Sequence, residues 1–479
     1  MVGGAIGGPI GATIGRAVGA LAGSAIDNAI FAPEATPTAP PADLQLLGSN
    51  EGDAIPRLYG WGRVTGNIIW ATELERETSL DSGSKGTTEE PEAETGETYL
   101  ASFAVGLCEG KVNHVGRIWA DGRLLETEGL DIRVHKGGEN QSVNSLIESK
   151  QGNAKAPAYR GLAYLVFDGL PLTQFGNRIP NISVEICRVV GDLEPAVRAI
   201  TVIPGSTEYG YDPEPRVRVL SAGRTANENT HALAQTSNWD ISISQLVDLC
   251  PNLKHVALVV AWFGDDLRAN QCKIQPRHEA TNREIVNRIW TVSGQGRADV
   301  PVVTTHDGGP AYGGTPSDDT VLAAIADLKS RGLSVTLYPF VMMDIEDDNS
   351  LQDLYTLTSG QGAYPWRGRI TCHPAPQVSG TPDQTSAAQS QIDSFVGSAS
   401  SGQFSTAQDT ISFSGGNDWG YRRMVLHYAH LCAMAGGVDA FLLGSEMRGL
   451  TQVRSGADTF PFVNALKTLA GDVRSVVGN

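Results

Sequence analysis

The sequence of 479 residues lacks paired cysteines. Its six cysteines lie far apart and form no Cys-x-x-Cys pair, so it lacks the spacing of a zinc site or of a thioredoxin-like motif. We expect reduced, buried thiols in a protein that folds in the cytoplasm. The six positions are Cys108, Cys187, Cys250, Cys272, Cys372 and Cys432.

Common catalytic and nucleotide-binding motifs are also missing. There is no P-loop, no Gly-x-Gly-x-x-Gly after a strand and no serine nucleophile elbow, which leaves an NTPase, a Rossmann enzyme or a triad hydrolase without support. The nine histidines show no His-x-His or His-Glu-x-x-His spacing. His427 and His430 stand three apart on a predicted helix, where they are expected to pack or to face solvent. We therefore expect no metal site and no cofactor.

Basic residues are few relative to acidic ones. The 36 Lys and Arg against 53 Asp and Glu give a net charge of −17, which repels phosphate backbones and argues against tight, non-specific nucleic-acid binding. The length predicts about two to four domains at roughly 100–200 residues each. With 41% hydrophobic residues, 55 Gly and 25 Pro, the composition excludes wholesale disorder and a coiled coil.

A four-residue repeat occupies the N-terminal region. Glycine recurs every fourth residue from Gly3 to Gly23, and aliphatic residues follow in the same period. This spacing predicts a helix over 1–32 with one ridge that lacks side chains and one aliphatic ridge. The expected helix-packing interface consists of Gly7, Gly11, Gly15, Gly19 and Gly23.

The alternatives for the repeat are a secretory signal, a membrane-inserting segment and, last, a disordered segment. A secretory signal is disfavoured because no Lys or Arg precedes the apolar run. A membrane-inserting segment stays open because the run is long enough to cross a bilayer, although Arg16 lies in its middle,. A proline-rich linker over 33–49 follows.

The region 50–200 has the pattern of a β-rich domain. Short alternating or apolar runs are separated by Gly, Asn and Pro,. The acidic stretch 74–98 lacks the carboxylate spacing of a calcium loop, so it is interpreted as a hairpin tip or a solvated loop. Ala120–Gly122 predicts a tight turn.

The region 201–479 changes to a strand, loop and helix rhythm that predicts a TIM-type or doubly wound α/β domain. The expected strands are Leu253–Phe263, Val300–Thr305, Ser334–Met343 and Val438–Ser445. The expected helices are Glu279–Thr291, Asp318–Arg331, Trp419–Ala435 and Phe460–Val476. A complete TIM barrel needs eight strands, so about four βα units predict an incomplete one.

Residues just past the carboxyl ends of barrel strands face the functional site. Glu446 is the catalytic candidate, and the alternative for it is a salt bridge to Arg448 or Arg422. For Asp265 and Asp266, the alternative to a functional role is that they cap a helix or pair with Arg268. The glycan-site candidates are Asp265, Asp266, His306, Asp307, Asp344 and Glu346.

Three runs in the β-rich region resemble a known family. They are IPRLYGWGRVTGNIIWATEL, YLASFAVGLCEGKVNHVGRIWADGRLL and APAYRGLAYLVFDGLPLTQFGNRIPNISVEI. They resemble the N-terminal hub region of siphophage tail-tip proteins and, more closely, the baseplate megatron proteins of gene transfer agents. WFGDDLR, PFVMMDIEDD and FLLGSEMRGLT resemble the TIM-barrel-like domain of the same proteins.

The resemblance implies a structural, non-enzymatic hub at the distal tail tip of a virion, assembled in the cytoplasm of a bacterial host. It implies a homotrimer that closes the tail tube and takes part in host attachment and DNA delivery. The implied partners are the distal tail protein and other baseplate subunits, the C-terminus of the tape measure protein, a host envelope glycan or receptor, and DNA in transit only.

The alternative function is a cell-envelope glycoside hydrolase or glycan-binding protein built on the barrel, and a third is a membrane-perforating module. Glu446 resembles the acid/base position of retaining glycosidases, although Ser445 stands where Asn is usual. The second carboxylate of such enzymes follows a later strand that the sequence lacks.

The glycine repeat makes a prediction with two opposite effects. In Gly11→Leu with Gly15→Leu, each change raises intrinsic helix propensity by about 1 kcal/mol, so circular dichroism of the free 1–32 peptide should show more helix. The added side chains push neighbouring backbones apart, so tails carrying the variant should fail to assemble or to eject DNA. Normal DNA delivery would show that the glycine ridge is not an interface.

Overall fold

A computed structural model describes residues 52–78, 97–153, 155–231 and 236–478. The helix predicted over 1–32, its glycine interface and the linker 33–49 lie outside the described residues, as does the centre of the acidic stretch. Among the helices of the described ranges, none is both long and apolar enough to cross a bilayer.

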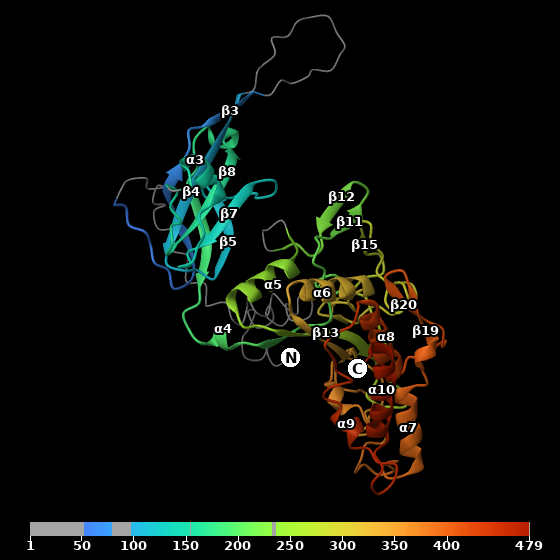
Figure 1. Ribbon diagram of the computed structural model, residues 1–479. Coiled ribbons are helices and arrows are strands. Elements are labelled where there is room, and N and C mark those ends of the chain that lie inside the picture. Colours follow the sequence, from blue (N-terminus) through green and yellow to red (C-terminus); the bar gives the residue numbers. More distant parts are fainter. Residues whose placement is uncertain (1–51, 79–96, 154, 232–235, 479) are drawn as a thin grey trace, which may run out of the picture.

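Two antiparallel sheets build the N-terminal body (Figure 1). The first sheet has the order β1 (Gly60–Thr65), β9 (Ile182–Arg188), β5 (His114–Ala120), β6 (Arg123–Leu124). The second has the order β2 (Asn67–Ala71), β4 (Glu97–Glu109), β8 (Leu162–Pro171), β7 (Asp131–Lys136), and β3 (Glu75–Thr78) also pairs with β4. The β-rich region expected from the sequence is confirmed.

The long strand β4 is apolar on both faces because both faces are buried. Phe103 and Val105 belong to the core shared with the first sheet. Ala104, between them, points to a second small core with Trp70 and Tyr164. Helix α3 (Ser145–Gln151) contributes Ile147 to that second core. A strand buried on both sides is a near-continuous hydrophobic run instead of an alternating one.

The structure bears on two turns predicted in this body, at 120–122 and within the acidic stretch 74–98. Asp121 and Gly122 both have positive φ, and Ala120 pairs with Arg123 across the turn, as in a tight hairpin. The two flanks of the acidic stretch form the hairpin of β3 and β4, in which Glu75 pairs with Leu100. The hairpin part of that interpretation is therefore confirmed.

The C-terminal body is built on a parallel sheet whose strand order follows the chain order. Its strands are β10 (Ala199–Val202), β13 (His255–Gly264), β18 (Ser334–Met343) and β21 (Ala440–Phe441). A doubly wound sheet reverses its order at a switch point, whereas consecutive parallel neighbours are the TIM arrangement. The TIM-type alternative is therefore the right one, and we call the sheet of these four strands the half barrel.

Helices connect the parallel strands and cover one face of the half barrel. They are α5 (Asn238–Leu249), α6 (Asp318–Ser330), α7 (Ser386–Val396), α8 (Tyr421–Met434) and α10 (Pro461–Val477). The predictions over 318–331, 419–435 and 460–476 are confirmed as α6, α8 and α10. Ser317 is the residue before α6, and Pro461 is at the first turn of α10, as their sequence signals predicted.

Short elements complete the structure. They are α4 (Leu193–Ala196), α9 (Arg448–Thr451), the 3₁₀ turns η1 (Thr173–Phe175), η2 (Arg367–Arg369) and η3 (Ser401–Gln403), and the strands β11 (Val217–Ser221), β12 (Arg224–Asn227), β14 (Ile274–Gln275), β15 (Glu284–Ile285), β16 (Thr305–His306), β17 (Gly309–Pro310), β19 (Phe404–Ala407) and β20 (Thr410–Phe413).

The predicted strand Val300–Thr305 and helix Glu279–Thr291 are wrong. The segment between β13 and α6 is a long irregular connection in which Val302 makes only an isolated bridge to His278. Asn287 has a positive φ, which ends a right-handed helix. The first strand of the sheet is instead β10, whose four residues are too short a run to stand out by periodicity.

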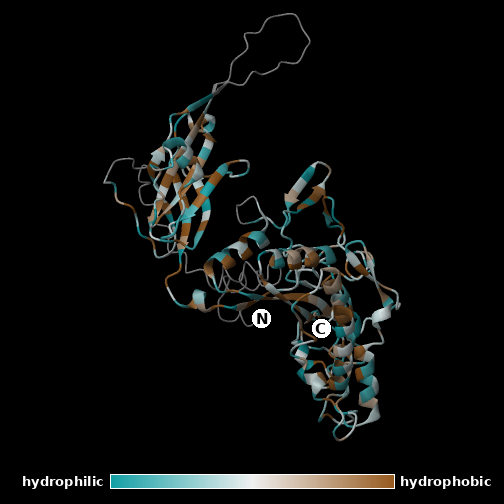
Figure 2. Cartoon of the chain, viewed as in Figure 1, coloured by the Kyte–Doolittle hydropathy of each residue, from teal (hydrophilic) through white to brown (hydrophobic). Residues whose placement is uncertain are grey.

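The two faces of the half barrel differ in how they are covered. Val256, Leu258 and Val335 point into the core under the helices, and Figure 2 shows hydrophobic residues along β13 and on the helices over it. Phe340 points to the opposite face and is half-buried. Ile203, which follows β10, is 68% exposed. On that opposite face Val259, Ala261 and Phe263 of β13 are buried, and Arg367 lies over the Phe340 ring, so loops of the described chain cover it in part.

One salt bridge cluster joins the two bodies. The Asp248 carboxylate of α5 accepts hydrogen bonds from His114 Nδ1 at 2.8 Å and from Lys136 Nζ at 2.6 Å. His114 lies on β5, and Lys136 is the last residue of β7. A single carboxylate therefore holds both sheets of the N-terminal body against α5.

A buried hydrogen bond between His427 and Asp318 ties α6 to α8. His427 Nε2 lies 3.0 Å from Asp318 Oδ1, and both side chains are fully buried. The second carboxylate oxygen accepts the Thr410 hydroxyl at 2.5 Å and the Ser293 N–H at 3.1 Å. His427 packs in the interior, which is one of the two roles expected from its spacing.

The Asp318 carboxylate should be a large contributor to stability. Asp318→Ala leaves the partners on α8, β20 and the 293 loop without an acceptor, and we expect the free energy of unfolding to fall by about 3 kcal/mol. Urea titration monitored by circular dichroism measures it. Asp409→Ala, an exposed aspartate in the neighbouring turn, serves as the control and should change little. Equal effects of the two variants would contradict the assignment.

Candidate functional site

The candidate residues predicted from the sequence stand at the carboxyl end of the half barrel. Asp265 and Asp266 follow β13, Asp344 and Glu346 follow β18, and Glu446 follows β21. The structure does not gather them into one site, because each group has its own local partners.

Asp266 pairs with Arg268, which was one alternative for it, whereas Asp265 binds a different partner. The buried Asp266 carboxylate accepts Arg268 Nη2 at 2.6 Å, the Arg268 N–H at 2.8 Å and the Gln361 amide at 2.8 Å. Asp265 accepts the N–H of Lys273 at 2.8 Å, and burial raises the pKa of the Asp265 carboxyl. Both carboxylates fix the loop after β13.

Asp344 is a buried tie between two loops. Its Oδ2 accepts Arg277 Nη1 at 2.7 Å and the N–H of Thr304 at 3.0 Å, and its Oδ1 accepts the Thr304 hydroxyl. Nearby, the Tyr312 hydroxyl donates to the carbonyl of Met343 at 3.1 Å, and burial raises the pKa of Tyr312. Asp344 is buried and already accepts three hydrogen bonds from its own chain, so it serves as an internal tie.

His306 lies between two carboxylates without a close contact to either. Its ring nitrogens are 3.8 Å from Asp307 and 3.8 Å from Asp347, and its ring meets the edge of Tyr364 at 5.4 Å. Glu346 is exposed. Ion pairs of this length at a surface contribute little, so these residues form a polar rim and not an ordered site.

Glu446 has a different environment from all the other candidates. Its Oε2 accepts the indole N–H of Trp366 at 2.6 Å and lies 3.2 Å from Arg367 Nη2. The expected partners were wrong: Arg367 takes the salt bridge, while Arg422 binds Asp472 at 2.6 Å. Glu446 also has a φ of 59°, an uncommon left-handed conformation for such a residue.

Arg367 organises the surroundings of Glu446. It donates from Nε to the Ser445 carbonyl at 3.0 Å and from Nη2 to the Ser445 hydroxyl at 2.9 Å. Its guanidinium lies 3.5 Å from the centre of the Phe340 ring, and burial lowers its pKa. Tyr338 donates its hydroxyl to Ser445 Oγ. We call these residues the Trp366 cluster: Tyr338, Phe340, Trp366, Arg367, Ser445 and Glu446.

Sequence reasoning found Ser445 and Glu446 of the Trp366 cluster and missed the rest. Trp366 and Arg367 stand more than twenty residues beyond β18, so the rule on strand ends did not reach them. The Trp-Arg-Gly-Arg run at 366–369 is the signal that could have drawn attention, since it combines a large aromatic residue with two cations in a turn.

The Trp366 cluster contains a single carboxylate. Glycoside hydrolysis requires two, about 5–5.5 Å apart in retaining and 6.5–9.5 Å apart in inverting enzymes. Within the described ranges there is also no group of three or more His, Cys, Asp or Glu that could hold a metal ion. The arrangement is suited to recognition by stacking and hydrogen bonds.

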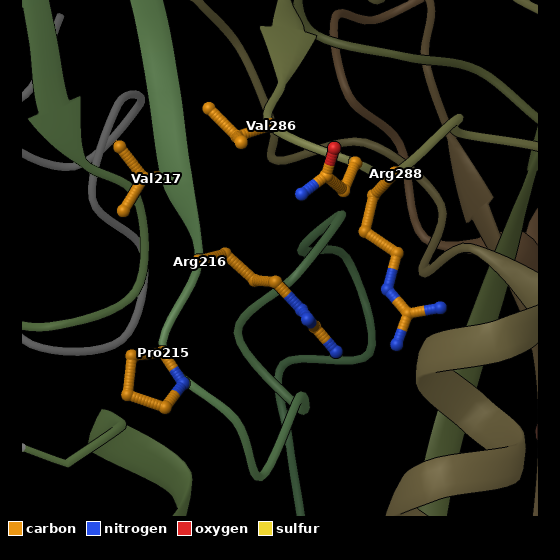
Figure 3. Close-up of a pocket in the computed structure, with 6 residues that line it drawn as sticks. Pro215, Arg216, Val217, Val286 and Arg288 are labelled. Atoms are coloured by element: carbon orange, nitrogen blue, oxygen red, sulfur yellow. The ribbon is translucent and has the colours of Figure 1, made fainter.

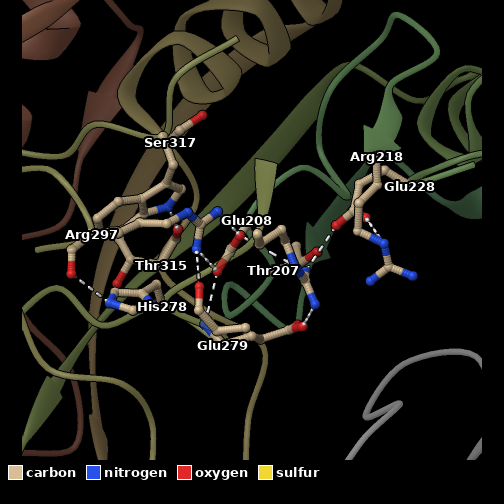
Figure 4. A network of polar contacts seen from close by, with 12 residues as sticks. Thr207, Glu208, Arg218, Glu228, His278, Glu279, Arg297, Thr315 and Ser317 are labelled. Carbon is tan, nitrogen blue, oxygen red and sulfur yellow. Dashed lines mark hydrogen bonds and ion pairs between the residues drawn. The ribbon is translucent and has the colours of Figure 1, made fainter. Parts of the chain in front are cut away.

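A buried ionic network holds the loops around this end of the half barrel (Figure 4). Glu208, fully buried, accepts Arg297 Nη1 at 2.9 Å and the N–H of Glu279 at 2.8 Å. Arg283 donates to Glu228 at 2.8 Å and also to Glu279. Burial raises the pKa of Glu228 and Glu279, and Arg283 opposes that shift. The network joins the loops after β10 and β13.

A hollow lies between the segments around Arg216 and Arg288 (Figure 3). It has a volume of about 330 Å³ and is lined by Pro215, Arg216, Val217, Val286, Asn287 and Arg288. Arg216 is neutralised there by Asp212 at 2.5 Å and Glu214 at 3.0 Å. The hollow contains none of the predicted site residues.

Comparisons with known proteins place the C-terminal segment in a class. Residues 419–479 match the family model described as the GTA TIM-barrel-like domain. This segment begins with α8 and continues through β21, α9 and α10. Strand β21 and the helices after it form the last βα unit of the half barrel, and α8 is the helix before that unit. The chain thus carries part of a TIM-barrel-like domain of the gene transfer agent type.

One solved structure is similar to part of the chain. A chain in "Virion of native gene transfer agent (GTA) particle" is 36% identical, over an alignment that covers 41% of this chain and 41% of that chain, with a TM-score of 0.26. The aligned part thus spans less than half of that relative. No curated protein matches the chain.

The Trp366 cluster predicts different effects for two arginines of one turn. Arg367→Met removes the donors to Ser445 and Glu446, and we expect it to lower the free energy of unfolding by about 2 kcal/mol. Arg369→Met, two residues away on the exposed side of the turn, is the matched control and should change it little. Urea unfolding of both variants measures the difference, and the reverse ranking would refute the role given to Arg367.

Proposed function

We propose that the chain is a structural protein of a gene-transfer-agent-like or related phage-like virion, located at the distal tail tip. There it serves as a hub that closes the tail tube and takes part in host attachment and DNA delivery. The observation that carries this proposal is the match of residues 419–479 to the GTA TIM-barrel-like domain. The order of the bodies, a β-rich body followed by a TIM-type sheet, is the order that the sequence resemblance implies.

A homotrimer is part of the proposal, and the edge of the first sheet supports it. Strand β1 pairs with β9 alone among the described strands. Trp61 on this edge is 47% exposed, and Tyr59 just before it is 61% exposed. Exposed aromatic residues on an open strand edge are a liability in a monomer and are suited to pairing with another chain.

The remaining partners follow from the same role. We propose contacts with the distal tail protein, other baseplate subunits and the C-terminus of the tape measure protein, the last through the glycine repeat. The net charge of −17 suits a conduit that DNA passes without adhering. A hydrolytic function has less support, since the Trp366 cluster contains one carboxylate where two are needed.

The proposed trimer makes a measurable prediction. Light scattering of the full chain should give three times the mass of one chain, because β1 edges pair between copies. Trp61→Glu should shift the mass toward one chain, since a charge on this edge opposes pairing. Leu193→Glu, at an exposed position of α4 between the two bodies, should leave the trimer intact.

The role in a virion is tested on the particle itself. Electron microscopy should place the chain at the tail tip on a three-fold axis. A monomeric chain together with a tail tip that lacks three-fold symmetry would contradict the proposed trimer. Absence of the chain from purified particles would contradict the proposed virion role.

A further inference from the structure

We propose that the Trp366 cluster is a binding site for a neutral saccharide, which stacks a sugar ring on the Trp366 indole and donates hydroxyl hydrogens to Glu446 without being hydrolysed. The proposal deepens the attachment role proposed above and rests on it for its biological setting. The binding itself is a property of the chain and can be measured apart from any particle.

The indole of Trp366 is built into a flat, supported platform. A Cβ atom placed on Gly368 would lie less than 3.0 Å from three carbon atoms of the indole, so the ring rests directly on the glycine backbone. Gly368 itself is buried, whereas Trp366 is 47% exposed. With one ring face closed by Gly368, the exposed area lies on the remaining part of the indole.

The turn that carries the indole is held from behind. A Cβ on Gly449 would lie less than 3.0 Å from the carbonyl oxygens of Gly368 and Ile370, so α9 packs closely on η2. The Thr371 hydroxyl also donates to the Gly449 carbonyl at 3.0 Å. A supported aromatic surface loses little conformational entropy on binding, which favours affinity.

The Glu446 carboxylate beside the indole has one oxygen, Oε1, that is open to a ligand. Both donors, Trp366 Nε1 and Arg367 Nη2, approach Glu446 Oε2, and no hydrogen bond from the described residues reaches Oε1. The side chain is 52% exposed. An ionised carboxylate accepts up to about four hydrogen bonds, so Glu446 can accept hydroxyl groups from a ligand seated on the indole.

The backbone at Glu446 is consistent with a placed functional group. A φ of 59° for a residue other than glycine is a strained conformation that persists where the surroundings impose it. Here Ser445, the preceding residue, is gripped by Arg367 and Tyr338. In this conformation the Glu446 carboxylate accepts the Trp366 indole N–H.

The charge of the site selects the chemistry of the ligand. Arg367 is buried under Glu446, so one cation balances the one carboxylate and the local charge is close to zero. A cationic ligand of the quaternary ammonium type is typically held by a cage of several aromatic rings, whereas only Trp366 of this cluster presents a largely exposed ring. A neutral sugar fits both features, since it has C–H bonds on its ring face and hydroxyl donors around its edge.

Calorimetric titration of the purified full chain tests the proposal. The probes are cellotetraose, maltotetraose, mannotetraose and tetra-N-acetylchitotetraose, and we expect at least one to bind with a Kd below about 1 mM. Trp366→Ala should weaken that binding at least tenfold and Trp366→Tyr should restore part of it, because the aromatic face carries the contact. Gly368→Ala should also weaken it, since the methyl group displaces the indole.

Two controls separate the site from other effects. Glu446→Gln should weaken binding about threefold to tenfold by removal of the charged acceptor, and no new reducing ends should appear with either form of the chain. Ile289→Ala removes an exposed apolar side chain outside the Trp366 cluster and should leave the Kd unchanged. Circular dichroism confirms that each variant is folded.

Several outcomes overturn the proposal. They are a wild-type chain that binds none of the four probes, a Trp366→Ala variant that binds as tightly as wild type, release of reducing ends that Glu446→Gln abolishes, and binding of tetramethylammonium in place of the sugars. Loss of binding in a chain that is still incorporated into tail tips refutes only the saccharide site. Binding by a chain that is absent from particles refutes only the virion role.

Discussion

The pairing of β13 with β18 is the contact on which the C-terminal body depends. Ten residues of each strand are in parallel register, from His255 opposite Ser334 to Gly264 opposite Met343. The N–H of Asp344 then continues the ladder to the carbonyl of Gly264 at 2.9 Å. Because both strands end at the same level, the loops that follow them begin side by side, and the whole carboxyl end of the half barrel is built from that edge.

Buried ion pairs hold this edge together. Part of the acidic composition therefore serves the fold and not a binding or catalytic site. Asp344 pairs with Arg277, and Glu208 pairs with Arg297. Each pair joins segments distant in sequence. Breaking a buried pair leaves an uncompensated charge or polar group in the interior, which costs far more than the loss of a surface pair. Several of the carboxylates that looked like site residues are therefore internal ties between long loops.

Glu446 and its neighbours are the exception, and the difference is one of exposure. Asp266 and Asp344 are surrounded by donors from their own chain, whereas Glu446 keeps part of its surface open next to an exposed indole. A virion protein that combines a rigid β-rich body with such a surface would unite assembly and recognition in one chain.

The sequence by itself determined the elements whose signals are local. Strongly apolar strands such as Ser334–Met343, helices followed by a glycine such as Asp318–Ser330 and the Asp121–Gly122 turn were predictable because periodicity, glycine signals and φ preferences act within a few residues. Tertiary structure decided the rest. The short strand β10 forms because β13 offers it a partner, with Ala199 opposite His255, and the 279–291 segment is not a helix because Glu279 and Arg283 are drawn into the network around Glu208. Trp366 meets Glu446 across 80 residues, and contacts of that range depend on how strands and loops pack, which no local pattern records.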